Sequence, residues 1–556
     1  MTRCLTRFEC GSIQSYIFAS NRLREAIGGS FLVKEAIEGT LYRTLNALFP
    51  DKTSVEWEAA ERLQILDDAS LQVEVLYSGG GNALVVCLDQ DIAIHLTSYL
   101  SSQLVALAPG LPLLAVHADF DESKLGDLGV ALEQTEQALE KLKREARFGV
   151  RREGLGVTRA CATTGQVAAF GLRNPDKDVS DDQKLLEWVS ASAAARRQAA
   201  DQAEAQLTKE YGKSGYEFPS DLDDIGGRKE VDNHIAVVHI DGNRIGSRLM
   251  GITKQQGLDN QTLAQQLRVF SKSVKTAADQ ALKQLVDELA GAIPRLKTLE
   301  NGLDIKIGQS GADYMPFRPL IYGGDDLTFV CEGRIGLALA ARYLKIFAQL
   351  SDSLKNKFAA CAGVVIARNH FPLARAYRLS EELCGTAKKR ARENDERSRG
   401  SWLDFHIIYS GITGQLEQMR PENEDTSNLL ANTIPYWRPW QVVSGIAEDR
   451  DRHNWQNFQD IAVNYFGADT IKSDQSTDNE QQKIWPRSWV KELREVLLQG
   501  EVATTRFLSQ AASRGYKLPD SIIGTSLGKN GWANGNTPFY DVVEALDFYL
   551  ELEVQT

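Results

Sequence analysis

Two short apolar runs, residues 317–322 and 327–331, flank the sequence Gly323-Gly324-Asp325-Asp326. Strand-like runs joined through a glycine pair predict a β-hairpin, and here the hairpin carries two adjacent carboxylates at its tip. A third apolar run, 234–240, ends at Asp241 and turns through Gly242 into a predicted helix. The pattern therefore predicts strands that end in acids.

The order of predicted elements occurs twice, which indicates an internal repeat. It predicts an α+β fold with two ferredoxin-like palm (βαββαβ) domains, each an antiparallel sheet covered by helices on one face. The first copy is predicted as strand 5–9, helix 31–47, hairpin 73–87, helix 90–107 and strand 113–118. The second is predicted as strands 234–240, 317–322, 327–331, 359–366 and 403–408 with helices 261–290, 335–356 and 373–391.

Four domains follow from this pattern: a degenerate first palm (1–120), a helical insert with a linker (121–230), a catalytic second palm (231–415) and a helical C-terminal domain (416–556). The insert is predicted as helices 125–148 and 181–207, followed by a polar loop, 214–233. Asp221, Asp223 and Asp224 in this loop lack the Glu that closes an EF-hand, so we interpret them as solvated. Six of the nine tryptophans lie in the last domain, beside predicted helices 486–499, 503–514 and 540–552, as in a packed helical core.

Composition narrows the function classes. The 556 residues carry a net charge of −12, which argues against holding nucleic acid by bulk electrostatics and favours small-molecule chemistry. Seven cysteines without a C-x-x-C pair indicate neither a zinc ribbon nor a disulfide framework, so we expect a cytoplasmic protein. We expect no membrane association, because no apolar stretch approaches the ~20 residues of a membrane helix.

The carboxylates suggest a cation site. Asp325 and Asp326 repel each other unless a cation lies between them and a further acid, for which Asp241 is the candidate. Oxygen ligands favour Mg²⁺ or Mn²⁺ over zinc. No acid–histidine zinc spacing surrounds His234, His239 or His370, so these are expected to be structural.

Two further motifs suit phosphate. The turn Gly242-Asn243-Arg244-Ile245-Gly246 enters a predicted helix and offers backbone N–H groups to a triphosphate. Lys388 and Arg392 lie four residues apart on one helix face and can grip the same phosphates. In nucleotidyl transfer, a 3′ hydroxyl attacks an α-phosphate and pyrophosphate leaves, which is the chemistry that paired cations and such phosphate contacts serve.

Each motif also has a plainer interpretation. Gly-Gly-Asp-Asp alone fits a solvated β-turn, and a basic helix end such as 388–392 fits a solvated face that suits the helix dipole. The hairpin tip of the first copy, Gly79-Gly80-Gly81-Asn82, is compatible with a tight turn. Its place in the repeat favours a nucleotide-binding half-site instead.

Together these motifs resemble the large, palm-containing subunit of type III CRISPR complexes and its stand-alone relatives, cousins of the GGDEF diguanylate cyclases. The resemblance covers roughly residues 1–415, and the C-terminal helices stand where that family has its last domain. There is no His-Asp dipeptide and no cysteine quartet, so neither the HD nuclease nor the zinc module of many such subunits is expected.

The resemblance implies an ATP-using synthetase of cyclic oligoadenylates or a related cyclic nucleotide, acting as an antiviral alarm. It implies Asp241 and Asp325 as metal ligands with Asp326 in support, and it adds Ile240 to the metal set. Nucleotide contacts are expected from Gly242, Asn243, Gly246, Gly323, Gly324, Lys388, Arg392, Gly79, Gly80, Gly81 and Asn82.

Two other functions stay open at this point. One is a non-catalytic scaffold or nucleotide sensor in a ribonucleoprotein complex; the other is a GTP-using enzyme of the diguanylate-cyclase kind. Release of pyrophosphate from ATP with manganese would separate the enzyme from the scaffold. Base preference, product ring size, activating signal, oligomeric state and any RNA–protein or regulatory partner are not determined by the sequence.

Overall fold

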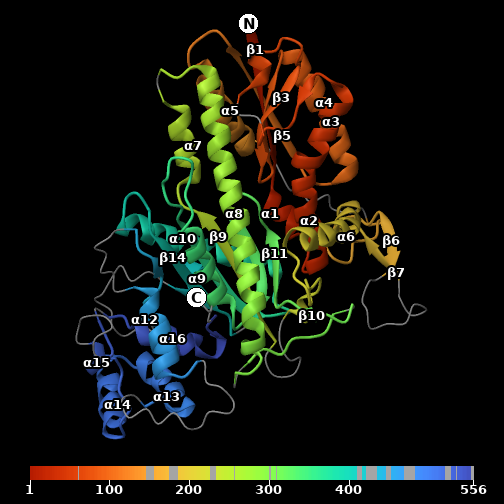
Figure 1. Cartoon of the computed structure of the whole chain (residues 1–556). Helices are drawn as coiled ribbons and strands as arrows, with labels where there is room; N and C mark the ends of the chain where they lie inside the picture. The colour runs from red at the N-terminus through yellow and green to blue at the C-terminus, as the bar shows by residue number, and fades with distance from the viewer. Residues whose placement is uncertain are drawn as a thin grey trace.

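The second palm is built on a six-stranded sheet with the order β11-β12-β9-β13-β14-β15 in the computed structural model of the chain (Figure 1). Its elements are β9 (His234–Gly242), α7 (Ile245–Thr253), α8 (Asn260–Leu296), β11 (Phe317–Ile321), β12 (Asp326–Glu332), α9 (Gly336–Phe347), β13 (Ala360–Arg368), α10 (Leu373–Asn394), β14 (Ser401–Ile407) and β15 (Trp440–Val443). The structure describes all residues except 60–61, 146–155, 174–185, 226–232, 256, 300–301, 309, 410–415, 421–434, 446–452, 469–482, 520–526, 534 and 553–556. The predicted hairpin and both flanking strands of the second repeat are confirmed.

Helices cover both faces of this sheet, where the sequence predicted only one. Ala236, Val238 and Ile240 of β9 pack into the core that α8 and α9 share. The alternate residues, including Ile235 and Val237, pack into a second core with α10. The reason is that β13 and β14 run parallel, so α10 must cross over the sheet to connect them.

The first palm repeats the strand order with different helix placement. Its sheet has the order β2-β3-β4-β1-β5. The elements are β1 (Thr2–Cys10), α1 (Ile13–Ile17), α2 (Leu23–Lys34), the π-helix η1 (Glu35–Thr40), α3 (Leu41–Leu48), β2 (Thr53–Ser54), β3 (Val73–Gly79), β4 (Asn82–Cys87), α4 (Gln90–Leu107), β5 (Leu113–Asp121) and α5 (Asp127–Glu145). The predicted order of strand, helix, hairpin, helix and strand is confirmed.

Helix α8 spans the two palms, and Figure 1 shows it running from one to the other. Near its start, Asn260 Nδ2 donates to the carbonyls of Glu122 at 3.0 Å and Lys124 at 3.1 Å. About two turns later, buried Arg268 donates to Glu74 at 2.8 Å and to the Val75 carbonyl at 2.7 Å. The second half of α8 packs against α9 of the second palm. One rigid element therefore sets how the palms face each other.

The insert departs from its prediction. Residues 186–189, predicted as helix, form the strand β7 (Leu186–Val189), which pairs with β6 (Phe170–Arg173), and α6 (Ala191–Tyr211) begins only after its N-cap Ser190. The loop predicted as polar buries Phe218, Leu222 and Ile225, and its β8 (Tyr216–Glu217) pairs with β10 (Asp313–Tyr314). Apolar side chains thus anchor it. Asp221 caps a short turn by accepting from Asp223 N at 3.0 Å, and Gly226-Gly227 lies outside the described residues.

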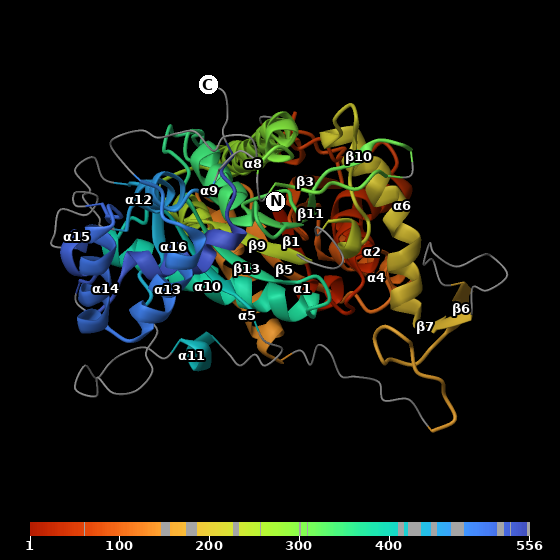
Figure 2. The same cartoon turned by 90° about the horizontal axis from the view of Figure 1, so that it is seen from below.

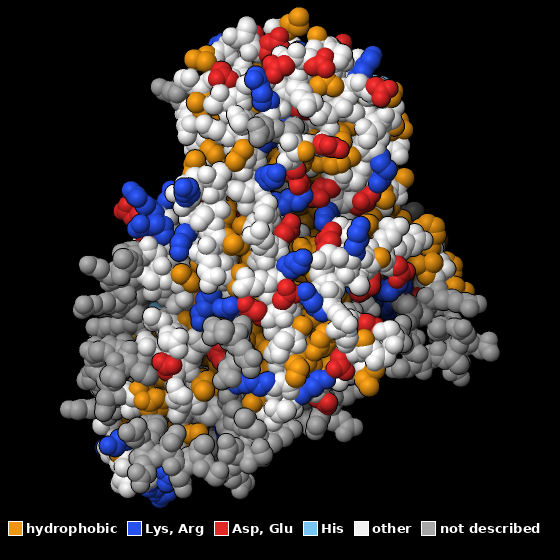
Figure 3. Space-filling model, in the orientation of Figure 1, with side chains coloured by type: hydrophobic (Ala, Val, Ile, Leu, Met, Phe, Trp, Pro, Cys, Tyr) orange, Lys and Arg blue, Asp and Glu red, His pale blue; other side chains and the backbone are white. Residues whose placement is uncertain are grey.

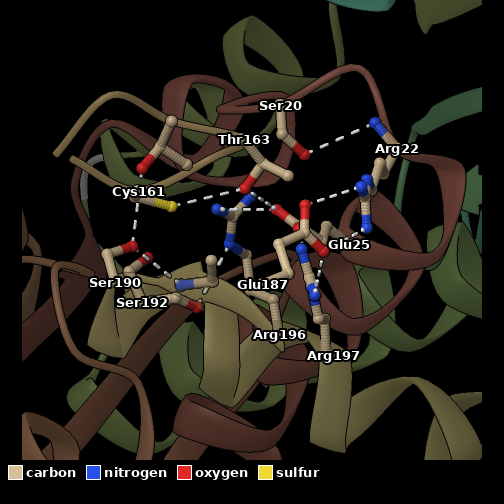
Figure 4. Close-up of polar contacts among 12 residues, drawn as sticks. Ser20, Arg22, Glu25, Cys161, Thr163, Glu187, Ser190, Ser192, Arg196 and Arg197 are labelled. Carbon is tan, nitrogen blue, oxygen red and sulfur yellow. Dashed lines mark hydrogen bonds and ion pairs between the residues drawn. The ribbon is translucent and has the colours of Figure 1, made fainter. Parts of the chain in front are cut away.

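A buried cluster of charges ties α6 to α2 (Figure 4). Glu25 pairs with Arg197 Nε at 2.9 Å and with Arg196 at 3.3 Å, and Arg197 reaches Glu187 at 2.9 Å. The two helices approach so closely that a Cβ on Gly28 would lie 1.7 Å from the Arg196 carbonyl oxygen. Glycine at position 28 is therefore what allows the ion pairs to form.

The C-terminal region is helical apart from β15, which extends the palm sheet by pairing with β14. Its helices are α11 (Leu416–Met419), α12 (Trp455–Asp460), α13 (Arg487–Leu498), α14 (Glu501–Ser513), α15 (Leu527–Asn530) and α16 (Pro538–Ala545). Buried Arg438 pairs with Asp541 at 3.1 Å and holds α16 close to β14. Two predicted helices end early, α16 at 545 and α9 at 347. After α9, the Asp352 carboxylate accepts from the backbone N–H groups of Leu354 and Asn356 and holds this part of the chain in a turn instead of a helix.

Surface charge gives no continuous basic area on the face shown in Figure 3, where Lys and Arg side chains alternate with Asp and Glu. Seen from below in Figure 2, the C-terminal helices and the β6–β7 hairpin lie at opposite ends of the molecule. Within the described residues, every helix is too short or too polar to cross a membrane.

We predict that Gly28→Ala destabilises the protein by about 1–3 kcal/mol, because the added methyl forces α2 and α6 apart at a buried ion cluster. Chemical denaturation followed by circular dichroism measures this. Gly291→Ala, at an exposed position of α8, is the control, because nothing lies within 4 Å of its added Cβ. Equal unfolding free energies for both variants would contradict the prediction.

Candidate functional site

Three potential metal ligands meet on the α10 face of the second palm sheet. Asp326 lies directly opposite Asp241 in the β12–β9 register, and Thr328 lies opposite His239. His239, Asp241 and Asp326 each offer a ligand atom, and these atoms all lie within 4.8 Å of one another. Such oxygen-rich ligands fit Mg²⁺ or Mn²⁺, and the added imidazole is compatible with Mn²⁺.

The sequence predicted Asp325 as the metal ligand beside Asp241 with Asp326 in support, and the strand register sets Asp326 opposite Asp241. Successive residues of a strand face opposite ways, so Asp326 joins Asp241, and Asp325 turns toward Gly242. A Cβ on Gly242 would lie 2.8 Å from Asp325 Cβ, and Gly242 N donates to the Asp325 carbonyl at 3.2 Å. The geometry thus favours Asp326 as the partner of Asp241, with Asp325 beside them. Ile240 packs its side chain on the opposite face, which leaves only its carbonyl for a ligand role.

Charge is costly at this cluster. Burial and the neighbouring Asp241 raise the pKa of Asp325 to about 6. Asp326 lines the cavity, and burial, then Asp325 and Asp241, raise its pKa well above the ordinary value. Burial lowers the pKa of His239 to about 4, so the ring is neutral near pH 7 and can serve as a ligand. A divalent cation would relieve the repulsion among the acids.

His239 was expected to be structural, and the structure instead places it beside the acids. Its Nδ1 lies 3.1 Å from Thr328 Oγ1, which orients the ring. The sequence signal that identifies it is the period-2 alternation of β9, which sets residues 239 and 241 on the same face. His234, by contrast, lies against Phe548 with ring centroids 4.8 Å apart.

Of the two predicted phosphate contacts on α10, Lys388 lies at the acid cluster and Arg392 does not contact it. Lys388 forms an ion pair with Asp241, and its Nζ donates to the Gly242 carbonyl at 3.3 Å. Although burial lowers the pKa of Lys388, Asp241 outweighs that effect and the pKa rises. Arg392 is exposed, and its Nε donates back to the Lys388 carbonyl at 3.3 Å. Lys388 thus orients Asp241, and Arg392 lies farther along α10.

The turn after β9 is held by a side chain that donates to backbone carbonyls. Asn243 is buried, and its amide donates to the carbonyls of Ser398 at 3.2 Å and Gly400 at 3.0 Å. Its side chain therefore holds the turn against the start of β14, and a nucleotide contact from it stays a prediction. Gly246 lies in the first turn of α7 and lines the main cavity.

The hairpins of the two palms face each other across that cavity of about 1020 Å³. Gly79, Gly80, Gly81 and Asn82 line one side, and Gly323, Gly324, Asp325 and Asp326 line the other. A Cβ on Gly80 would lie 3.9 Å from the Gly323 carbonyl oxygen. Gly80 and Gly81 have φ of 60° and 79°, as a tight hairpin turn requires, and Asn82 Nδ2 closes that turn by donating to the Gly80 carbonyl at 3.3 Å.

Several cavity residues gave no sequence signal. Lys34 lies over the Tyr322 ring, 5.6 Å from its centroid, and Lys275 and Lys283 project from α8. Lys283 makes no ion pair with any residue that the structure describes. These lysines come from helices 240 residues apart in sequence, so no local motif could have grouped them. They add cationic side chains to the cavity wall, and the phosphate contacts expected from Lys388 and Arg392 stay a prediction.

We predict that Asp326→Asn leaves the metal-free protein equally or more stable, since it removes one of three repelling acids. It should also abolish stabilisation by Mn²⁺, which for the wild type is about 2.7 kcal/mol at a concentration of 100 Kd. Thermal unfolding with and without Mn²⁺ measures both effects. Asp91→Asn, an exposed acid in the first turn of α4, should keep the full shift. An undiminished shift in Asp326→Asn would place the cation elsewhere.

Comparison with known proteins agrees with this geometry. Residues 234–397 match the family model described as Cas10/Cmr2, second palm domain. Among solved structures, a Csm1–Csm4 cassette in complex with AMPPNP aligns over 98% of this chain and 69% of that chain, with a TM-score of 0.53 and 11% identity. Cassettes in complex with pppApA and with one ATP align with a TM-score of 0.50 each, at 11% and 12% identity; the former covers 98% of this chain and 69% of that chain, and the latter 98% and 70%.

No protein of curated function matches the chain by sequence. At such low identity the solved structures establish the fold, while the family model identifies the domain that carries Asp241, Asp325, Asp326 and Lys388. Residues 234–397 thus match a palm of the Cas10/Cmr2 type, and the chain as a whole is similar in fold to Csm1.

Proposed function

We propose that the protein is a metal-dependent nucleotidyltransferase that joins ATP into a cyclic oligonucleotide with release of pyrophosphate. The observation that supports this best is the cavity itself. It sets the acid hairpin of the second palm opposite the glycine hairpin of the first. A phosphodiester bond needs a donor and an acceptor nucleotide held side by side, and two facing half-sites meet that need.

The donor nucleotide belongs to the second palm. His239, Asp241 and Asp326 would hold the cation, with Asp325 beside them, and Lys388 fixes the orientation of Asp241. A bound divalent cation supplies charge stabilisation for the phosphates and lowers the pKa of the attacking hydroxyl. The N–H groups at the start of α7, near Gly246, face the same cavity and suit phosphate oxygens.

The triphosphate extends toward the lysines of the cavity wall. Lys283 is unpaired among the described residues, and Lys34 lies 3.8 Å from Glu210, a long ion pair that a phosphate can replace. The acceptor nucleotide belongs to the first palm, where Gly79, Gly80 and Gly81 expose backbone without side chains. This half lacks acids at its hairpin and relies on the metal site opposite.

Related structures support a nucleotide ligand. The aligned Csm1–Csm4 cassettes hold AMPPNP, pppApA or one ATP, which is an adenine nucleotide in each case. By analogy we propose ATP as the substrate, an antiviral signal as the product, the cytoplasm as the location and a protein partner of the Csm4 kind. In the scaffold alternative the acids would hold metal without turnover, and a GTP-using enzyme differs only in the base.

We predict that the purified chain releases pyrophosphate from ATP in the presence of Mn²⁺ and that Asp241→Asn lowers the rate at least ~100-fold, by removing a ligand of the charge-stabilising cation. A coupled pyrophosphate assay and mass spectrometry of the product measure this with each of the four NTPs. A wild-type chain that binds ATP without releasing pyrophosphate would support the nucleotide-sensor function instead.

We also predict that Gly80→Val abolishes product formation while one nucleotide still binds at the second palm. The side chain is strained at φ 60° and narrows the gap to Gly323. Gly257→Val is the matched control, since Gly257 has φ 82°, is exposed and has nothing within 4 Å of its added Cβ. Calorimetry should find two ATP sites in the control and one in Gly80→Val. Full activity in Gly80→Val would make the first palm structural and pair second palms from two chains.

A further inference from the structure

The first-palm wall of the cavity contains a polar recess beside two aromatic rings. Trp57 and Tyr77 both line the cavity, and their ring centroids lie 6.3 Å apart at an interplanar angle of 75°. Glu38 reaches the same wall from the π-helix η1, between α2 and α3. A π-helical segment within an α-helix widens the helix locally and is often found at functional sites. Aromatic walls with one convergent polar group are typical of a pocket for a flat heterocycle.

Glu38 is a polar group of this recess without a hydrogen-bond or ion-pair partner among the residues that the structure describes. Around it, Lys275 pairs with Glu58 at 2.6 Å, and Tyr211 donates to Asp279 at 3.2 Å. Tyr42 and Ser78 share a hydrogen bond at 2.5 Å. The Glu38 carboxyl makes neither a hydrogen bond nor an ion pair with any residue in the described parts of the chain. A half-buried carboxyl with its neighbours already paired is available to a ligand.

The surroundings shift this carboxyl toward its neutral form. Burial raises the pKa of Glu38; Lys34 from α2 and Lys275 from α8 oppose the rise, and Glu58 and Asp279 add to it. A neutral carboxyl offers one O–H donor and one carbonyl acceptor side by side. Adenine presents the complementary pair on its Watson–Crick edge, the N1 acceptor beside the N6 amino donor. Guanine presents two adjacent donors, which an ionised carboxylate would match instead.

We propose that Glu38 reads the Watson–Crick edge of an adenine held on the first palm, beside Trp57 and Tyr77, and so selects the base of the acceptor nucleotide. This inference deepens the proposed function and rests on it, in that the occupant of the first-palm half-site is a nucleotide. The base then lies in the recess, and the sugar and phosphates extend past Gly79–Gly81 toward the acids of the second palm.

Calorimetry of the full chain with Mn²⁺ and non-hydrolysable analogues of ATP and GTP tests this assignment. Glu38→Ala should weaken ATP-analogue binding at one of two sites about tenfold or more, since a buried base edge loses both hydrogen bonds, and should leave GTP-analogue binding unchanged. Glu38→Gln keeps one donor and one acceptor and should hold the ATP analogue within about twofold of wild type. Glu56→Gln, an exposed acid nearby, is the control.

The pH dependence provides a second measurement. As pH rises through the pKa of Glu38, the wild type loses the neutral form, so its ATP-analogue affinity at that site should fall relative to Glu38→Gln, which does not titrate. Comparison with the Gln variant cancels the ionisation of the phosphates. The same ratio at every pH would contradict the assignment.

Three results would overturn it. Equal weakening of both analogues in Glu38→Ala would indicate a phosphate or structural role. A Glu38→Gln variant as weak as Glu38→Ala would indicate that the ionised carboxylate acts, through guanine or a cation. Unchanged binding in both variants would remove Glu38 from the site. Because binding is measured without turnover, a chain that binds as expected but releases no pyrophosphate keeps this inference and loses the proposed reaction.

Discussion

The arrangement of the site depends on how α8 is fixed to both palms. At 37 residues the helix is about 55 Å long, enough to cross from one sheet to the other. Arg268 is 2% exposed. It donates to the Glu74 carboxylate and to the carbonyls of Val75 and Leu76, all in β3 of the first palm. A buried guanidinium is tolerated only when its donors are satisfied, so these contacts lock the orientation of α8. The same helix lines the cavity through Lys275, Asp279 and Lys283.

The second constraint is electrostatic. Strand register holds Asp326 opposite Asp241, and the hydrogen bond from Gly242 N to the Asp325 carbonyl keeps Asp325 beside them. Packing of the sheet therefore fixes the three carboxylates close together without a ligand. Lys388 pairs with Asp241, while burial and Asp241 raise the pKa of Asp325, and burial, Asp325 and Asp241 raise the pKa of Asp326. A fold that keeps such repulsion in a cavity wall has lower stability than it could have, which is a usual cost of a site that binds a cation.

The two palms share an architecture and differ in what their hairpins present. In the second, glycines 323 and 324 let the chain turn, and acids follow at once. In the first, the turn is closed by Asn82, and the polar chemistry has moved to the helices, where Glu38 and Lys34 approach the cavity from the side. The cavity is therefore asymmetric, with the candidate metal ligands on the second-palm side only.

The sequence by itself determined the repeat, the two hairpins and the acids at the tip of the second one, because strand alternation and glycine turns are local properties that a short window records. It also predicted that Asp241 and the hairpin acids would meet. It could not determine which acid pairs with Asp241, since that depends on the β12–β9 register, nor that His239 joins them. Other features arise from contacts between distant segments. They are the hydrogen bonds from Asn243 to the carbonyls of Ser398 and Gly400, the Lys388–Asp241 ion pair, and the placement of the α2 and α8 lysines at one cavity. Only the tertiary structure, through α8, brought the glycine hairpin to face the acidic one.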